Sequence, residues 1–179
     1  LLAEAGSDDV DDDLVSIEPD GVYLPAEWNT LESPETYAGH ARATGFASPG
    51  GLEPDRRRVY VEPPQLELNH WALSGAWTVG NQFTTLNEPG GRIVHRFHGR
   101  DLNLVLGSEM NGRPVRFLVS IDGEPPRRAH GLDVDERGNG TVSEERLYQL
   151  IRQDGPITER TFEITFLDAG AQAYVFTFG

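Results

Sequence analysis

Cysteine and lysine are both absent from the 179 residues of this sequence. Without cysteine, this stretch can form neither disulfides nor thiolate metal sites, and it cannot carry out thiol redox chemistry. The 15 basic residues are therefore all arginines, and they stand against 29 aspartates and glutamates for a formal net charge of -14. Such an excess of negative charge repels nucleic acid and anionic lipid surfaces, so we expect neither as a partner.

Long apolar runs are also lacking. No run approaches the roughly 20 residues that a membrane-spanning helix needs, and the N-terminus lacks the basic start and apolar core of a signal peptide. We therefore expect a soluble globular unit, with any membrane anchor or export signal outside this stretch. A chain of this length suits one domain with a sizeable core.

The first 18 residues differ in composition from the rest. "LLAEAG" contains strong helix formers closed by Gly6, which predicts the last turn of a helix whose beginning is missing. The acidic run that follows predicts a solvated linker, so residues 1–18 are assigned to a helix end plus linker and residues 19–179 to the globular domain. The first part of that domain is rich in Pro and Gly, and we expect it to pack over the surface of a sheet. Within this segment we expect a short helix at 35–43.

From residue 66 onward, short runs of alternating apolar residues are separated by clusters of Gly, Asn, Asp and Pro. In "RDLNLVLGS" the leucines alternate with Asn103 and Val105, and in the closing "AYVFTFG" the alternation places Tyr174, Phe176 and Phe178 on one side. About nine such strands and no clear long helix predict an all-β fold. We expect a jelly-roll β-sandwich with an irregular N-terminal segment.

Two tryptophans, Trp71 and Trp77, lie in one of these runs, "NHWALSGAWTVG". An uninterrupted strand would place both on one face, whereas a bulge at Gly75 would place them on opposite faces. Each ring either belongs to the core, which is favoured, or offers a flat platform to a sugar. Around such a platform, carbohydrate binding would use polar side chains on or beside the strand faces: Asn69, His70, Arg96, His98, Arg116 and Gln149.

Two aromatic residues lie in the irregular N-terminal segment. Trp28 and Tyr37 are each expected to act as a plug covering the sandwich, with the lip of a groove as the alternative.

A metal site has weaker support. "HGLDVDERGNG" offers Asp133, Asp135 and Asn139 as the oxygen ligands of a weak Ca²⁺ site. The segment lacks the glycine at the sixth position and the glutamate at the twelfth that complete an EF-hand, so a long connecting loop is favoured. His95 and His98 are three apart in a predicted strand, and they therefore face opposite ways and cannot share one metal.

The chain also contains several long motifs: "SPETYAGHARATGFASPGG" at 33–51, "LNHWALSGAWTVG" at 68–80, "GGRIVHRFHGRDLNLVLG" at 90–107, "VRFLVSIDGEPP" at 115–126, "HGLDVDERGNGTVSEERLYQLIRQ" at 130–153 and "ITERTFEITFLDAGAQAYVFTFG" at 157–179. Together they resemble the C-terminal region of DipZ-type thiol-disulfide interchange proteins. In that family, a CcdA-like membrane domain is followed by a thioredoxin-like domain and a jelly-roll module of the galactose-binding or carbohydrate-binding type. Both soluble parts lie outside the cytoplasm.

The resemblance implies a place and a partner for this domain. Residues 1–6 would end the last helix of the thioredoxin-like domain, which would be the partner within the same parent chain. The parent would act in extracytoplasmic electron transfer, in the periplasm or cell envelope, and in cytochrome c biogenesis. This domain would be attached to the membrane only through the membrane domain of the parent protein.

Redox chemistry in that family needs a Cys-x-x-Cys pair, which this stretch lacks. We therefore expect a non-catalytic accessory module without a cofactor, whose ligand would be a cell-envelope glycan. One alternative is a protein-docking domain for the redox domain or its substrates. A further alternative is an envelope glycan hydrolase, although the sequence carries no recognisable catalytic signature.

Overall fold

The computed structural model describes residues 31–109 and 113–179. Within these ranges the chain forms a 3₁₀ turn at Arg127–Ala129, no α-helix and eleven strands. The strands are β1 (Thr36–Tyr37), β2 (Arg57–Tyr60), β3 (Trp71–Val79), β4 (Thr84–Leu86), β5 (Arg92–His98), β6 (Asp101–Ser108), β7 (Val115–Ile121), β8 (Asn139–Val142), β9 (Arg146–Arg152), β10 (Glu159–Phe166) and β11 (Ala171–Phe178). The all-β prediction is confirmed. The expected helix end, the acidic linker and Trp28 lie outside the described residues.

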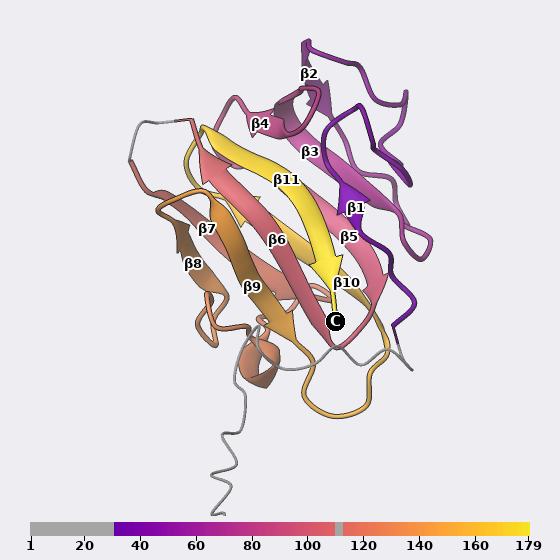
Figure 1. Ribbon diagram of the computed structural model, residues 1–179, viewed down its shortest axis with the longest axis vertical. Helices are drawn as coiled ribbons and strands as arrows, with labels where there is room; N and C mark the ends of the chain where they lie inside the picture. The colour runs from indigo at the N-terminus through magenta and orange to yellow at the C-terminus, as the bar shows by residue number, and fades with distance from the viewer. Residues whose placement is uncertain (1–30, 110–112) are drawn as a thin grey trace, which may run out of the picture.

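The strands form two layers that share β3. The rear layer has the order β8, β7, β10, β5 and the first half of β3, and the front layer continues from the second half of β3 through β4, β11, β6 and β9. In the front layer, β1 pairs with β11 and β2 pairs with β3, and all of these strand pairings are antiparallel. Figure 1 shows β11, β6 and β9 in front of β10 and β7. The architecture is a β-sandwich of jelly-roll type, as predicted.

The core lies between the two layers and is filled by every second side chain. Leu102, Leu104 and Leu106 of β6 are fully buried, in keeping with the alternation of the sequence. Aromatic rings from the rear layer contact rings from the front layer: Phe166 with Trp77 at 5.9 Å between centroids, Phe162 with Phe176 at 6.1 Å and Phe117 with Tyr148 at 6.5 Å. Burial of each such side chain contributes about 1.5–3 kcal/mol, so this interface is the main source of stability.

Strand β3 passes from the rear layer to the front layer at Gly75. Residues before it pair with β5 and residues from it onward pair with β2 and β4. Gly75 has φ of 98°, a conformation that side chains other than glycine rarely adopt, and a Cβ there would lie 2.9 Å from Gly91 Cα. Because the strand turns at this point, Trp71 and Trp77 enter the core from two different layers.

A bulge interrupts the alternation of β11. Ala173 pairs with Leu106 and Phe176 with Leu104, so Tyr174 and Val175 both stand opposite the single residue between these leucines. Phe176 is fully buried, whereas Tyr174 and Val175 lie half-buried on the outer face of the front layer. The expectation that Tyr174 shares a side with Phe176 is therefore wrong, because the extra residue shifts the alternation by one.

The expected helix at 35–43 is not formed. Thr36 and Tyr37 instead pair with Phe176 and Val175 as the short strand β1, and a turn follows. The backbone N–H of Ala38 donates to the carbonyl of Tyr174 at 2.8 Å, which extends this pairing. The otherwise free edge of β11 offers the segment a hydrogen-bonding partner, and this outweighs its local helix signals.

No helix among the described residues is both long and apolar enough to cross a membrane.

Candidate functional site

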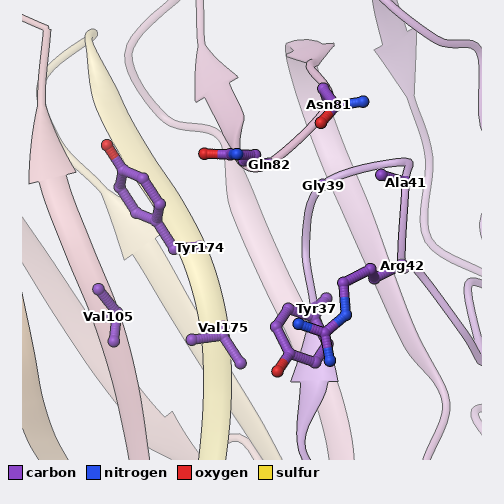
Figure 2. A pocket seen from close by; sticks show the side chains of 9 residues that line it. All are labelled: Tyr37, Gly39, Ala41, Arg42, Asn81, Gln82, Val105, Tyr174 and Val175. Carbon is purple, nitrogen blue, oxygen red and sulfur yellow. The ribbon is translucent and has the colours of Figure 1, made fainter.

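A groove of about 390 Å³ opens on the outer face of the front layer. Figure 2 shows the residues that line it: Tyr37, Gly39, Ala41, Arg42, Asn81, Gln82, Val105, Tyr174 and Val175. They come from β1 and the turn after it, from the turn between β3 and β4, and from β6 and β11. Its volume lies at the lower end of the range typical of small-molecule sites, roughly 300–1,000 Å³.

The floor of the groove is a consequence of the bulge in β11. Because Tyr174 and Val175 both face outward, they lie beside Val105 of β6 and form one apolar surface with it. The ring of Tyr174 packs against Phe83 with 4.9 Å between centroids. A Cβ at Gly107 would lie 3.3 Å from the Tyr174 ring, so the glycine leaves room for the ring along β6.

The opposite wall is the turn that follows β1. The backbone N–H groups of His40 and Ala41 donate to the carbonyls of Gly80 and Asn81, at 2.9 Å and 3.1 Å. Gly39 makes this docking possible, because a Cβ at that position would lie 2.3 Å from the backbone carbon of Gln82. The turn thereby places Arg42 on one side of the groove, while Asn81 and Gln82 present exposed amide side chains on another.

Two tyrosines flank the groove, and a carboxylate orients each of them. The hydroxyl of Tyr37 donates to Glu35 at 2.8 Å, and this bond is the main reason that the pKa of Tyr37 is raised. The hydroxyl of Tyr174 donates to Glu145 at 2.9 Å. Burial and then Glu145 raise the pKa of Tyr174 to about 12. Both phenols therefore stay protonated at neutral pH, and both rings are held in fixed positions.

From the sequence, Trp71 and Trp77 were candidates for an aromatic platform, with the core favoured for each ring, and the structure contradicts the platform. Both side chains are fully buried. Each indole N–H is satisfied inside the fold, Trp71 by the carbonyl of Thr44 and Trp77 by the carbonyl of Ser74, both at 2.9 Å. Neither ring has an exposed face for a ligand, so the favoured interpretation, that each ring belongs to the core, describes both.

Asn69 and His70 lie away from the groove. Asn69 accepts a hydrogen bond from the Ser33 hydroxyl at 2.6 Å and donates to the carbonyl of Glu32 at 3.1 Å. Its side chain thus fastens the N-terminal segment to the sandwich. His70 stands 3.8 Å from the carboxylate of Glu67.

The other predicted ligand residues do not line the groove either. Arg96 forms an ion pair with Glu159 at 2.7 Å, and Arg116 forms one with Asp168 at 2.8 Å, both on the rear layer. His98 ends β5 of the same layer, and its backbone N–H binds the Ser33 hydroxyl. Gln149 of β9 is buried, and its side-chain oxygen accepts from the backbone N–H of Leu132.

The three proposed Ca²⁺ ligands do not share one site: Asp135 and Asn139 bind each other, and Asp133 binds other residues. Asp133 accepts hydrogen bonds from Arg146 at 2.8 Å and from the backbone of Gln149 at 2.7 Å. Asp135 accepts from the side chain and backbone of Asn139, and these bonds lower its pKa. In 31–109 and 113–179, no three side chains of His, Asp or Glu are grouped so as to hold a metal ion.

The two histidines of β5 face opposite ways, as expected. His95 is fully buried in the core, and His98 lies on the outer side of the rear layer.

Most of the groove was missed by sequence reasoning. Of the lining residues, only Tyr37 was a candidate from the sequence. A plug covering the sandwich was favoured for it over the lip of a groove, and the structure places it at the lip. The remaining lining residues depend on the bulge in β11 and on the docking of the turn against Asn81. The "AG" pair at Ala38 and Gly39 was the available signal of a close backbone approach.

Comparison with known proteins gives a family and a relative. Residues 33–179 match the family described as "Thioredoxin like C-terminal domain". Protein DipZ from Mycobacterium bovis and Protein DipZ from Mycobacterium tuberculosis are each 30% identical to this chain over 115 residues. That alignment covers 56% of this chain but 16% of either relative, so the chain corresponds to a small part of their length.

Among solved structures, a family two carbohydrate esterase from Cellvibrio japonicus has a TM-score of 0.46 and 14% identity, over 60% of this chain and 30% of the esterase chain. A likeness of this size is too weak to bear on function. The family match, in contrast, extends over most of the chain. The protein therefore belongs to the thioredoxin-like C-terminal domain family and is related to DipZ.

Proposed function

We propose that this domain is a non-catalytic accessory module that binds carbohydrate in the groove of the front layer. The observation that carries the proposal is the combination of an apolar floor, a fixed aromatic ring and exposed amides on one face. Val105 and Val175 supply the floor, Tyr174 supplies the ring, and Asn81 and Gln82 supply the amides.

This combination matches the chemistry of a sugar ring. A pyranose presents C–H groups on its faces, which pack on an apolar or aromatic surface, and hydroxyl groups on its edge, which need donors and acceptors. Amide side chains provide both, since each has a carbonyl acceptor and two N–H donors. The guanidinium of Arg42 covers part of the Tyr37 ring, so Tyr174 and the valines form the available stacking surface.

The relation to DipZ supports a place for the domain in a larger protein. It would follow a thioredoxin-like domain in a membrane-bound thiol-disulfide interchange protein that functions in cytochrome c biogenesis, on the extracytoplasmic side. The 179 residues hold no cysteine, so thiol exchange would belong to another part of the parent chain. Binding to a cell-envelope glycan would keep the redox domain close to the wall.

The test is a calorimetric titration of the chain with a panel of cell-wall glycans. Tyr174→Ala removes the ring and should weaken binding roughly three- to tenfold. Leu118→Ala is the matched control, because Leu118 is 40% exposed on the outer face of the rear layer. An absence of binding across the whole panel would remove the proposal, as would equal effects of the two substitutions.

A second candidate function, protein docking, has support from the rear layer. Leu118 and Leu167 are 40% and 43% exposed, and they flank the Arg116–Asp168 ion pair. Apolar side chains beside charged pairs are typical of protein interfaces. If this face docks the thioredoxin-like domain, Leu118→Asp should weaken association of the separately produced domains, measured by calorimetry, and Tyr174→Ala should not.

A further inference from the structure

Arg42 is the cationic side chain that lines the groove. Its guanidinium carbon lies 3.6 Å from the centroid of the Tyr37 ring. That ring is itself fixed by the pairing of β1 and by the bond to Glu35. Stacking therefore sets the orientation of the guanidinium plane and leaves N–H groups at its edge for an acceptor.

Within the described part of the chain, no carboxylate forms an ion pair with Arg42. Most other arginines are paired with carboxylates, as Arg96 is with Glu159 and Arg116 with Asp168. Among the described residues the other arginines without an ion pair are Arg58, Arg113, Arg127 and Arg137, and they do not line the groove. In a chain with 29 acidic and 15 basic residues, carboxylates are in excess, so an arginine left without one at the wall of a groove is a candidate binding group.

We propose that the ligand of this groove is an acidic saccharide, such as a uronate-containing glycan, and that its carboxylate binds the guanidinium of Arg42. The inference rests on the carbohydrate-binding function proposed above and specifies its class of ligand. A carboxylate matches the planar fork of an arginine with two parallel hydrogen bonds, which a single sugar hydroxyl cannot form.

The flanking acids restrict where that carboxylate can lie. Glu35 and Glu145 accept hydrogen bonds from the hydroxyls of Tyr37 and Tyr174 at the margins of the groove, and like charge disfavours an anionic group beside either. The net charge of -14 acts at longer range, but at physiological salt its field is screened over about 8 Å. The local charge of Arg42 therefore decides the preference inside the groove.

The experiment compares two probes that differ only in the acid. One is a cello-oligosaccharide, and the other is the uronate oligomer of the same linkage and length made by oxidising its primary hydroxyls. Each is titrated into the full chain by calorimetry, with sodium acetate as a third arm. The variants are Arg42→Gln, Arg42→Lys and the control Arg128→Gln, which removes the same charge from a side chain that is 90% exposed.

The wild-type chain should bind the uronate oligomer about tenfold more tightly than the neutral oligomer, or better, since hydrogen bonds between charged groups are among the stronger ones. Arg42→Gln should abolish this preference, Arg42→Lys should retain a part of it, and Arg128→Gln should leave it unchanged.

Equal affinity for the two oligomers overturns the inference and leaves the carbohydrate-binding function standing. A preference that survives Arg42→Gln overturns the role of Arg42, and acetate binding as tight as that of the uronate overturns the requirement for a sugar. Failure of both oligomers and of the wider glycan panel overturns the inference together with the proposed function.

Discussion

His95 should make the stability of this domain fall as the solution is acidified, well before most carboxylates are protonated. The imidazole is fully buried between the layers, with the rings of Phe176 and Phe178 at 5.0 Å and 5.3 Å. Its Nδ1 faces the carbonyl of Arg96 at 3.1 Å, and its Nε2 faces the hydroxyl of Thr36 at 3.3 Å. A carbonyl can only accept, so the neutral ring carries its proton on Nδ1 and accepts at Nε2.

Burial is the main reason that the pKa of His95 is lowered from 6.5 to about 3; the hydrogen bond to the Arg96 carbonyl opposes this shift, and the neighbouring His70 adds to it. The folded state therefore binds the proton more weakly than the unfolded state does. The stabilising contribution is complete above pH 6.5, the pKa of the unfolded chain, and is lost as the pH falls toward about 3. One pKa unit corresponds to about 1.4 kcal/mol, so the loss between about pH 6.5 and pH 4.5 is about 2–3 kcal/mol.

The assay is urea denaturation across that pH range, with the free energy of unfolding extrapolated to water. His95→Gln removes the titrating group, and His130→Gln is the matched histidine control at a loop position. The wild type and His130→Gln should lose about 2–3 kcal/mol more than His95→Gln over the range. If all three proteins lose the same free energy, His95 does not titrate as its burial requires and the reasoning is refuted.

Three further predictions concern other parts of the molecule. Hydrogen bonds from Arg116 lower the pKa of the Asp168 carboxyl to about 2, and NMR titration should show this value rise in Arg116→Gln; an unchanged titration would contradict the ion pair. Gly39→Ala should destabilise the domain by about 1–3 kcal/mol in urea denaturation, because the added methyl meets the backbone of Gln82, and wild-type stability would argue against this docking. Trp77→Ala should cost about 3–5 kcal/mol in the same assay, whereas an exposed ring would cost little.

The sequence predicts the fold well wherever strands are long and regular. Alternation identified the buried side of β6, since Leu104 is buried as expected. About nine strands were predicted, and eleven are formed among the described residues. The short strands β1, β2, β4 and β8 were not identified individually, because two to four residues carry too little alternation to be recognised. The helix predicted at 35–43 is not formed, because part of this segment pairs with β11 instead. That contact joins residues about 140 positions apart in the chain, and local helix signals do not take it into account.

The candidate site was hardly predictable, and the reasons are specific. The bulge at Tyr174 moves one ring to the outer face, and nothing in "AYVFTFG" marks the extra residue. Whether Trp71 and Trp77 lie on one face of β3 or on opposite faces depends on the passage of the strand from one layer to the other at Gly75. Alternation identified residues such as Arg96 as polar and outward-facing. It does not show which loops from distant parts of the chain lie on the same face of the sandwich as those side chains.

The central claim is that the groove of the front layer is the carbohydrate-binding surface of this domain. The most direct measurement is an NMR titration of the isotope-labelled chain with cell-envelope glycans, in which backbone and side-chain amide shifts are mapped residue by residue. The account predicts shifts concentrated at Asn81, Gln82, Arg42 and Tyr174, with the rear layer around Leu118 unaffected. Saturable shifts centred on the rear layer, or no shifts with any glycan, would contradict it.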